Sequence, residues 1–330
     1  MIQPRRALII GHFSTIGDID SLDYVRGVLD EQGIAYDILP YKPKFVDDIA
    51  GATVISRVDP AAYTHLIAVC GPLWPELLDK WGVALEHFAH CTRIGVNLTM
   101  VLPLDAWNPF HLLLERDSSR ATRPDITFLQ PTRRAPLVGL CTIARQREYG
   151  ERQQHGRAIA LMKALIDARG LAAIGIDTRW PKGRNAGGLG SPAAVMAVID
   201  KLDAMLTNRL HGMVYALKAG VPVLAIDPVR GGDKVVAQAA VLGWPAVTTV
   251  EDATADKMAE LLDWCLSATG REAAKGVAER ARAQLQPTAT QLRDALSAEF
   301  DDLPLPAAPR SARQSLTRRL VRGLTGKRPT

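Results

Sequence analysis

The chain has 330 residues, of which 47% are hydrophobic and 23% are charged. This composition excludes an intrinsically disordered or fibrous protein, and the length predicts about two globular domains. No stretch approaches the ~20 apolar residues of a membrane-spanning helix. The apolar run that ends at Gly11 is too short for a signal peptide, so we expect a cytoplasmic protein.

The basic residues are concentrated at the C-terminal end. The chain carries a formal net charge of +5, yet residues 303–330 hold seven basic side chains and no acidic one. The remainder is slightly acidic, so the net charge gives no indication of nucleic-acid binding by the folded part. We expect residues 303–330 to form a basic, flexible tail.

The four cysteines and seven histidines do not form a metal-binding pattern. The cysteines are widely separated, which excludes a zinc knuckle or a CxxC pair and is typical of single thiols in a reducing cytosol. His87 and His90 have the i, i+3 spacing of a ligand pair on a helix, but no third ligand lies near them in the sequence. We therefore expect no metal.

Short apolar runs alternate with helix-length segments in the first 132 residues. A glycine-containing loop, residues 11–18, follows the first apolar run, and helical spacing of apolar residues begins at Ser21. This alternation predicts a parallel sheet covered by helices, which is a Rossmann-like domain over residues 1–132. The expected strands are 7–11, 35–40, 65–69 and 93–100, and the expected helix is 21–32.

The alternation restarts after a proline-punctuated stretch that contains Pro124, Pro131 and Pro136. We expect a second Rossmann-like domain over residues 133–302. The predicted fold class is therefore α/β, with two doubly wound domains that face a cleft, as in the GT-B arrangement. The expected strands are 137–143, 172–177, 204–207 and 221–227, and the expected helices are 151–169, 193–201, 210–218, 234–242, 255–266 and 271–300, the last interrupted near Pro287.

The segment after the strand that ends at Thr207 carries the clearest chemical signal. Asn208 is predicted as the N-cap of the helix over 210–218, which places Arg209 and His211 in its first turn. Ligands of parallel sheets bind at this carboxyl edge, and a helix N-terminus favours anions. Arginine can hold a phosphate or a carboxylate with two parallel hydrogen bonds. The alternative is a surface ion pair for Arg209 and a packing role for His211.

A series of motifs resembles polysaccharide pyruvyl transferases. The most specific are Arg-Leu-His at 209–211 and Ala-Gly-Val-Pro at 219–222, separated by an apolar helix. Ile-Gly-Asp at 16–18 and Glu-Arg-Asp-Ser-Ser-Arg at 115–120 resemble further elements of the family, in the same order. The resemblance covers about residues 5–250.

This resemblance implies a GT-B fold without a metal or a bound cofactor. The donor substrate would be phosphoenolpyruvate, and the acceptor a pair of sugar hydroxyls on a polysaccharide or a lipid-linked glycan precursor. Arg209 and His211 would be catalytic, and Leu210 would complete the donor-binding tripeptide. Histidine is a common general acid or base, so His211 could act as acid, as base or only as a phosphate ligand.

Further substrate-binding residues follow from the same resemblance. The family uses an arginine early in its second domain, and both Arg145 and Arg147 fit this position. Lys234 matches a lysine that follows the motif. In the first domain, the matching residues that we expect to bind substrate are Arg116, Asp18 and Gly17.

One departure from the family concerns the acceptor side. The family often has a Gly-Gly-Gly turn after its third or fourth strand, and this chain has Gly-Pro-Leu-Trp at 71–74.

Two residues of the first glycine-containing loop have two possible roles each. His12 could face the cleft or be an ordinary loop histidine, and Asp18 could bind the acceptor or cap a helix. The glycine-rich loop 183–190 could be a lid or a plain linker.

Two other functions remain open from the sequence. A nucleotide-sugar glycosyltransferase of the same fold would need a carboxylate after the phosphate-binding helix, and Glu251 and Asp252 could supply it. A degenerate, non-catalytic glycan-binding member of the family is the other alternative. Retention of Arg209, His211 and Lys234 argues against the second.

The C-terminal tail suggests a reversible contact with a membrane. In residues 311–324, Leu316, Leu320 and Leu324 follow i, i+4, i+8 spacing, and four arginines lie mostly off this stripe. A short basic amphipathic helix of this kind can lie on an anionic membrane surface. We therefore expect a protein that is peripheral at the inner face of the cell membrane, or else one with a disordered, solubilising tail.

Overall fold

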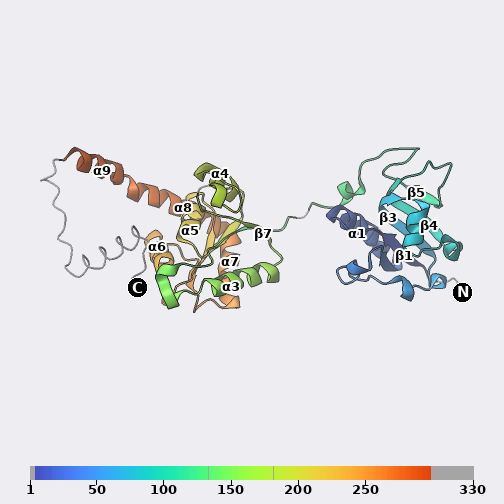
Figure 1. Ribbon diagram of the computed structural model, residues 1–330, viewed down its shortest axis with the longest axis horizontal. Helices are drawn as coiled ribbons and strands as arrows, with labels where there is room; N and C mark the ends of the chain where they lie inside the picture. The colour runs from blue at the N-terminus through green and yellow to red at the C-terminus, as the bar shows by residue number, and fades with distance from the viewer. Residues whose placement is uncertain (1–3, 133, 181, 299–330) are drawn as a thin grey trace, which may run out of the picture. The chain divides into compact units, whose positions relative to one another are not determined.

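The computed structural model divides the chain into two compact units between residues 133 and 134. It describes residues 4–132, which we call unit 1, and residues 134–180 and 182–298, which we call unit 2. Each unit contains a five-stranded sheet in which every pair of neighbouring strands is parallel (Figure 1). The prediction of two doubly wound α/β domains is therefore confirmed. The cleft between the domains stays a prediction.

The sheet of unit 1 has the strand order β2-β1-β3-β4-β5. The chain leaves β1 toward β2 and then crosses back to β3 on the other side, so the sheet has its switch point between β1 and β3. The elements are β1 (Arg6–Gly11), α1 (Ile16–Glu31), β2 (Ala35–Pro40), β3 (His65–Leu73), α2 (Pro75–Lys80), β4 (Thr92–Met100) and β5 (Leu112–Leu114).

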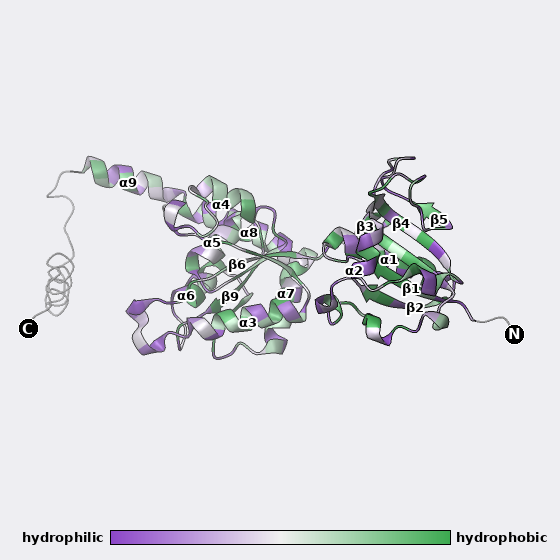
Figure 2. Cartoon of the chain, turned by 45° about the vertical axis from the view of Figure 1, so that its right-hand side comes forward, coloured by the Kyte–Doolittle hydropathy of each residue, from purple (hydrophilic) through white to green (hydrophobic). Residues whose placement is uncertain are grey.

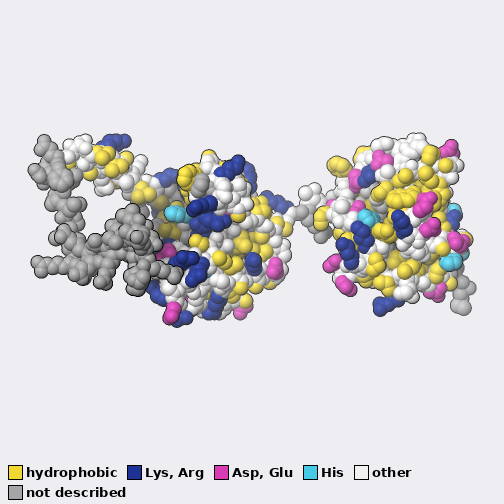
Figure 3. Space-filling view, in the orientation of Figure 1, with side chains coloured by type: hydrophobic (Ala, Val, Ile, Leu, Met, Phe, Trp, Pro, Cys, Tyr) yellow, Lys and Arg dark blue, Asp and Glu magenta, His cyan; other side chains and the backbone are white. Residues whose placement is uncertain are grey.

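Strand β1 shows why unit 1 is covered on both faces. Successive side chains of a strand point to opposite faces. Leu8 and Ile10 belong to one buried hydrophobic cluster, and Ala7 and Ile9 belong to the other. Figure 2 shows hydrophobic residues concentrated on these strands, and Figure 3 shows apolar side chains gathered on one outer face of unit 1.

The sheet of unit 2 has the strand order β10-β9-β8-β6-β7, which places the switch point between β6 and β8. Helices α3 and α7 pack together on one side of the sheet, and α4 and α5 pack together on the other (Figure 1). The elements are β6 (Leu137–Cys141), α3 (His155–Ala168), β7 (Ala172–Gly175), α4 (Pro192–Ile199), β8 (Ala204–Thr207), α5 (Leu210–Lys218), β9 (Val223–Asp227), α6 (Lys234–Leu242), β10 (Val247–Thr249), α7 (Ala255–Leu266), α8 (Ala268–Leu285) and α9 (Pro287–Ser297).

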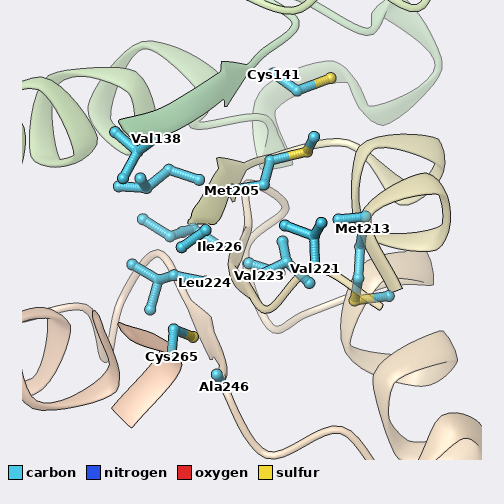
Figure 4. Close-up of a cluster of buried hydrophobic side chains, with 14 of the residues drawn as sticks. Val138, Cys141, Met205, Met213, Val221, Val223, Leu224, Ile226, Ala246 and Cys265 are labelled. Atoms are coloured by element: carbon cyan, nitrogen blue, oxygen red, sulfur yellow. The ribbon is translucent and has the colours of Figure 1, made fainter. Parts of the chain in front are cut away.

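The central strands of unit 2 are fully buried. Every residue of β8 and β9 is buried, because both faces of the sheet are covered by helices. Figure 4 shows this core, in which Met205, Leu224 and Ile226 lie among side chains from the neighbouring helices. The edge strand β7 is exposed along its whole length. The carboxyl ends of β6 and β8 therefore lie in the core, and Ile176, the first residue after β7, is also buried there.

Several predicted boundaries are wrong, each for a local reason. Helix α1 begins at Ile16 and not at Ser21, because Thr15 caps it. The helix predicted from Glu151 begins at His155, since a 3-10 segment, Arg147–Arg152, with Gly150 at φ 52° comes first. The strand predicted over 65–69 continues to Leu73, so Gly71, Pro72 and Leu73 belong to β3.

None of the described helices is long and apolar enough to cross a membrane. The four cysteines are all free and all buried. The predicted tail, residues 303–330, lies outside the described residues.

Candidate active site

The turn between β8 and α5 carries the Arg-Leu-His motif. Arg209 is the N-cap residue of α5 and has extended backbone, with φ −117° and ψ 134°. Its backbone N–H donates to Oγ1 of Thr207 at 3.0 Å. Because the Arg209 side chain makes no capping hydrogen bond, the N–H groups of the first turn of α5 can face an anion.

The prediction that Asn208 caps α5 is wrong. Its Oδ1 accepts a hydrogen bond from the N–H of Ile143 at 2.8 Å, and its Nδ2 donates to the carbonyl of Ile143 at 3.0 Å. Asn208 is 1% exposed, so its amide needs partners inside the protein, and the loop after β6 supplies both. The side chain therefore ties the loop after β6 to the turn after β8.

Gly212 brings α5 close to the sheet. A Cβ atom at this position would collide with Oγ1 of Thr207 and would come within 3.0 Å of Sγ of Cys141. Thr207 and Cys141 are both fully buried and cannot move aside. The motif is therefore Arg-Leu-His-Gly for a packing reason, because glycine lets α5 start directly against β6 and β8.

A pocket of about 510 Å³ lies at the carboxyl ends of β6, β7 and β8. Thr142, Ile143 and Ala144 line it from the loop after β6, and Arg209 lines it from the turn after β8. This is the switch point of the unit 2 sheet, where ligands of doubly wound folds bind. The third wall comes from the segment after β7, which contributes Asp177, Arg179, Ala186 and Gly187.

Asp177 lies between two arginines in this pocket. Its carboxylate accepts from Nη2 of Arg179 at 2.7 Å and from Nε of Arg179 at 2.9 Å. Its Oδ1 is 3.8 Å from Nη1 of Arg209. The hydrogen bonds from Arg179 are the main reason why the pKa of Asp177 lies well below its ordinary value. Asp177 is therefore ionised at neutral pH, and the pocket holds two positive charges and one negative charge.

The glycine-rich loop 183–190 is folded against the end of β7. Asn185 is 7% exposed and donates from Nδ2 to the carbonyls of Asp177 and Arg179. Its Oδ1 accepts from the N–H groups of Gly187 and Leu189. The loop is thus a built wall of the pocket, and its conformation depends on one buried amide.

The other two residues of the motif are not among the residues that line the pocket. His211 is exposed, and its ring centroid is 6.5 Å from that of Tyr215 on the next turn of α5. Leu210 is partly buried against the hydrophobic core of unit 2. Within the described residues, Arg209 is therefore the member of the tripeptide that lines the pocket.

The remaining predicted donor-side residues lie outside the pocket wall. Arg145 and Arg147 are both exposed, and the last residue of their loop to line the pocket is Ala144. Nζ of Lys234 lies 5.3 Å from the ring centroid of Tyr149. Lys234 is the first residue of α6. Asp227, at the end of β9, stabilises the start of this helix, because its Oδ2 accepts hydrogen bonds from the N–H groups of residues 233, 235 and 236.

Arg116 of unit 1 is engaged by neighbouring groups. Its guanidinium donates to Asp117 at 2.8 Å, to Asp125 at 3.2 Å and to Thr99 at 2.7 Å. The Arg116 guanidinium is therefore already paired with two carboxylates and a hydroxyl. Its predicted role in substrate binding stays a prediction.

The loop after β1 contains the other predicted residues of unit 1. Asp18 and Thr15 form a capping box at the start of α1, in which Oδ2 of Asp18 accepts from the N–H groups of Ser14 and Thr15. Burial alone would raise the pKa of Asp18, but these hydrogen bonds outweigh it and lower the pKa. Gly17 is exposed in the first turn, and Nδ1 of His12 lies 3.1 Å from Oγ of Ser14.

The carboxyl edge of the unit 1 sheet carries backbone strain. Phe13, Cys70 and Asn97 have φ angles of 41°, 54° and 54°, in the left-handed region that favours glycine. The pairing of β3 with β4 is interrupted between Val69↔Val96 and Gly71↔Leu98, where Cys70 and Asn97 lie. The assignment of unit 1 to the acceptor side stays a prediction.

The carboxylates considered for a nucleotide sugar do not line the pocket. Glu251 accepts from the N–H of Gly231, and Asp252 accepts from Oγ1 of Thr249. No group of three or more His, Cys, Asp or Glu side chains in the described ranges could hold a metal ion.

Sequence reasoning missed Asp177, Arg179 and Asn185. Asp177 was placed at the end of the strand predicted over 172–177, which is the position that carries ligand contacts in parallel sheets. The position of Asp177 at a strand end could therefore have identified it as a candidate site residue. The contribution of Asn185 had no signal, because the sequence does not show that loop 183–190 folds back onto the end of β7.

Together these features define an α/β protein whose second unit has an arginine-lined pocket at the switch point of a parallel sheet. Residues 117–228 match the model of the polysaccharide pyruvyl transferase family. The match confirms the resemblance over these residues and supports a transferase at the level of the family. The matched residues include all those that line the pocket and the Arg-Leu-His motif. They do not include Arg116 or Lys234.

Solved structures at low sequence identity align with most of this chain. The glycosyltransferase of kitacinnamycin has 13% sequence identity and a TM-score of 0.29, over 86% of this chain and 96% of that chain. The spinosyn rhamnosyltransferase SpnG in complex with spinosyn aglycone has 12% identity and a TM-score of 0.35, over 88% and 100%.

A third similar structure is the UDP-GlcNAc 2-epimerase of Methanocaldococcus jannaschii in complex with UDP-GlcNAc and UDP. It has 9% identity and a TM-score of 0.29, over 80% of this chain and 93% of that chain. The comparison with curated proteins gives no significant match.

Proposed function

We propose that the protein transfers pyruvate from phosphoenolpyruvate to a pair of hydroxyls on a polysaccharide or lipid-linked glycan precursor. The observation that carries this proposal is the position of Arg209. It lies at the N-terminus of α5, in a pocket at the switch point, inside the stretch that matches the family model. Phosphoenolpyruvate carries a phosphate and a carboxylate, and an arginine beside a helix N-terminus suits either group.

The chemistry requires one proton transfer to carbon and two from oxygen. C3 of phosphoenolpyruvate gains a proton, C2 becomes oxocarbenium-like, and the first sugar oxygen bonds to C2. The C2–O bond to phosphate breaks, the second sugar oxygen bonds to C2, and a pyruvate ketal and inorganic phosphate result. Of the two hydroxyl protons, one balances the proton gained at C3 and the other leaves with phosphate.

Two residues have proposed roles in this sequence. Arg209 stabilises the negative charge of the donor and of the leaving phosphate, in a partly dry pocket where such an interaction is strong. His211 is exposed on the same turn and is proposed to move a proton to or from the reacting groups.

The test is release of inorganic phosphate from phosphoenolpyruvate with a panel of sugar acceptors. We expect release that depends on both the acceptor and the protein. Arg209→Gln and His211→Gln are expected to lower the rate at least about a hundredfold, since groups of this kind contribute on the order of 10²–10⁴. Circular dichroism checks that both variants are folded.

Two results would overturn the proposal. One is near-normal phosphate release by either folded variant. The other is thermal stabilisation by UDP or GDP with none by phosphoenolpyruvate, which would favour a nucleotide-sugar glycosyltransferase.

We also propose where the protein acts. The basic residues of segment 303–330, which is known here from its sequence, would hold the protein at an anionic membrane surface. Lipid-linked glycan precursors lie at such a surface, so the tail would raise the local concentration of the acceptor.

A further inference from the structure

The pocket of unit 2 contains a second arginine that the motif does not include. Arg179 lines the pocket together with Arg209, and the two come from the segments after β7 and β8. The side chain of Arg209 is 17% exposed and that of Arg179 is 57% exposed. Arg209 therefore lies deeper in the pocket, and Arg179 lies nearer to its mouth.

Asp177 fixes the guanidinium of Arg179. Its carboxylate engages Nε and Nη2 of Arg179 in a two-point contact, with distances of 2.9 and 2.7 Å to Oδ2. A guanidinium has five N–H groups, so within the described part of the chain Nη1 and the second N–H of Nη2 are available to a ligand. A side chain that is held in place before binding loses less entropy when the ligand arrives.

Asp177 is itself held rigidly. Its Oδ1 accepts from the N–H of Arg179 at 2.9 Å, and its Oδ2 accepts from the N–H of Ala186 at 2.7 Å. Its side chain is 10% exposed and lies 3.8 Å from Arg209. This half-buried carboxylate therefore positions Arg179 and the loop that forms the third wall, and it lies within ion-pair distance of Arg209.

We propose that Arg179 is the second anion-binding side chain of this pocket and that Asp177 is the positioning residue that holds it beside Arg209. The ligand is a small molecule with two anionic groups, one for each arginine. This inference rests on the proposed function, in which the ligand is phosphoenolpyruvate. It assigns the second donor-binding position to Arg179, which lines the described pocket wall, rather than to Arg145 or Arg147, which do not.

The first test compares three arginine variants by isothermal titration calorimetry of the full chain. The probes are phosphoenolpyruvate and inorganic phosphate. Arg179→Gln is expected to raise the Kd for phosphoenolpyruvate about tenfold or more, the loss of one charged hydrogen-bonding contact. Arg145→Gln and Arg147→Gln remove the same charge from neighbouring loop positions, so they are the matched controls, with expected changes within about twofold.

The second test is a double-mutant cycle between Asp177 and Arg179. Asp177→Asn keeps an oxygen for the backbone N–H groups but removes the charge that holds Arg179. We expect it to raise the KM for phosphoenolpyruvate with little change in kcat. Because Asp177 acts through Arg179, the double variant Asp177→Asn/Arg179→Gln is expected to be no worse than Arg179→Gln alone.

The outcomes separate this inference from the proposed function. If the wild type binds phosphate but not phosphoenolpyruvate, the proposed function fails, and the arginine variants are judged with phosphate. If Arg179→Gln binds as the wild type does, or if Arg145→Gln or Arg147→Gln loses binding instead, the role of Arg179 is wrong. Tighter binding by Asp177→Asn, or additive losses in the cycle, would overturn the positioning role. A wild type that binds neither probe overturns both proposals.

Discussion

Single buried amides determine the shape of the pocket. Asn208 joins the loop after β6 to the turn after β8 through two hydrogen bonds with Ile143, and Asn185 joins the loop 183–190 to the end of β7. Both side chains are under 10% exposed, so each lost hydrogen bond would leave a buried polar group without a partner. The shape of the pocket therefore depends on two residues that do not line it.

Glu115 gives a pH-dependent test at the scale of one residue. Hydrogen bonds from Arg120 lower the pKa of Glu115 from 4.5 to about 2, and the Glu115 side chain is fully buried. Because the folded pKa is lower than the unfolded one, this carboxylate stabilises the fold above about pH 4.5, and the contribution is lost as the pH falls toward 2.

We therefore expect the free energy of unfolding of wild-type protein to fall between pH 5 and 3 more steeply than that of Glu115→Gln. Urea unfolding at several pH values measures both. Asp256→Asn, in the exposed first turn of α7, is the control for a carboxylate outside this ion pair. Parallel pH profiles for wild type and Glu115→Gln would contradict the assignment.

At the scale of elements, the sequence predicted the interior of unit 2 better than its edges. The bounds of β8, α5, α6 and α7 were correct, because buried strands and amphipathic helices carry strong apolar periodicity. Strands β5 and β10 were missed, since three residues are too few to show a period.

The candidate site was predictable only in part. The position of Arg209 followed from a strand end and a helix start, which are local signals. The positions of Asp177 and Arg179 depend on how the segment after β7 folds, and β7 is a short, exposed edge strand without a periodic pattern. Long-range contacts of such segments are set by tertiary structure, which single-sequence patterns do not contain.

The closeness of α5 to the sheet gives a test at the same scale. Gly212→Ala adds a methyl group where Thr207 and Cys141 leave no room, so α5 must shift. We expect a loss of about 1–3 kcal/mol in the free energy of unfolding. Since Arg209 caps α5, binding of phosphoenolpyruvate should weaken as well.

Gly156 is the matched control for this substitution. It lies in α3, and a Cβ atom there would have nothing within 4 Å. Gly156→Ala is expected to be neutral or to stabilise by up to about 1 kcal/mol, the difference in helix propensity. Urea unfolding of both variants measures the effect, and a Gly212→Ala protein as stable as Gly156→Ala would show that α5 does not need the close approach.

At the scale of the whole molecule, charge and chemistry are separated along the chain. Both units are parallel α/β folds, and the arginine-lined pocket belongs to unit 2 alone. The excess of basic residues belongs to residues 303–330, which lie outside the described residues. The positive net charge of the chain therefore comes from the tail and not from the pocket. The roles of the tail and of the pocket can be tested independently.

The prediction for the tail is salt-sensitive binding to anionic membranes. Residues 311–324 carry four arginines beside an apolar stripe, and each basic residue near an anionic surface contributes about 1 kcal/mol. We expect the full chain to co-sediment with vesicles that contain anionic lipid, at low salt more than at high salt, and not with neutral vesicles. Arg318→Gln/Arg319→Gln/Arg322→Gln should lose most of this binding and keep its phosphate-release activity on a soluble acceptor. Equal binding by the full chain and by a chain truncated after Leu303 would rule out the membrane contact.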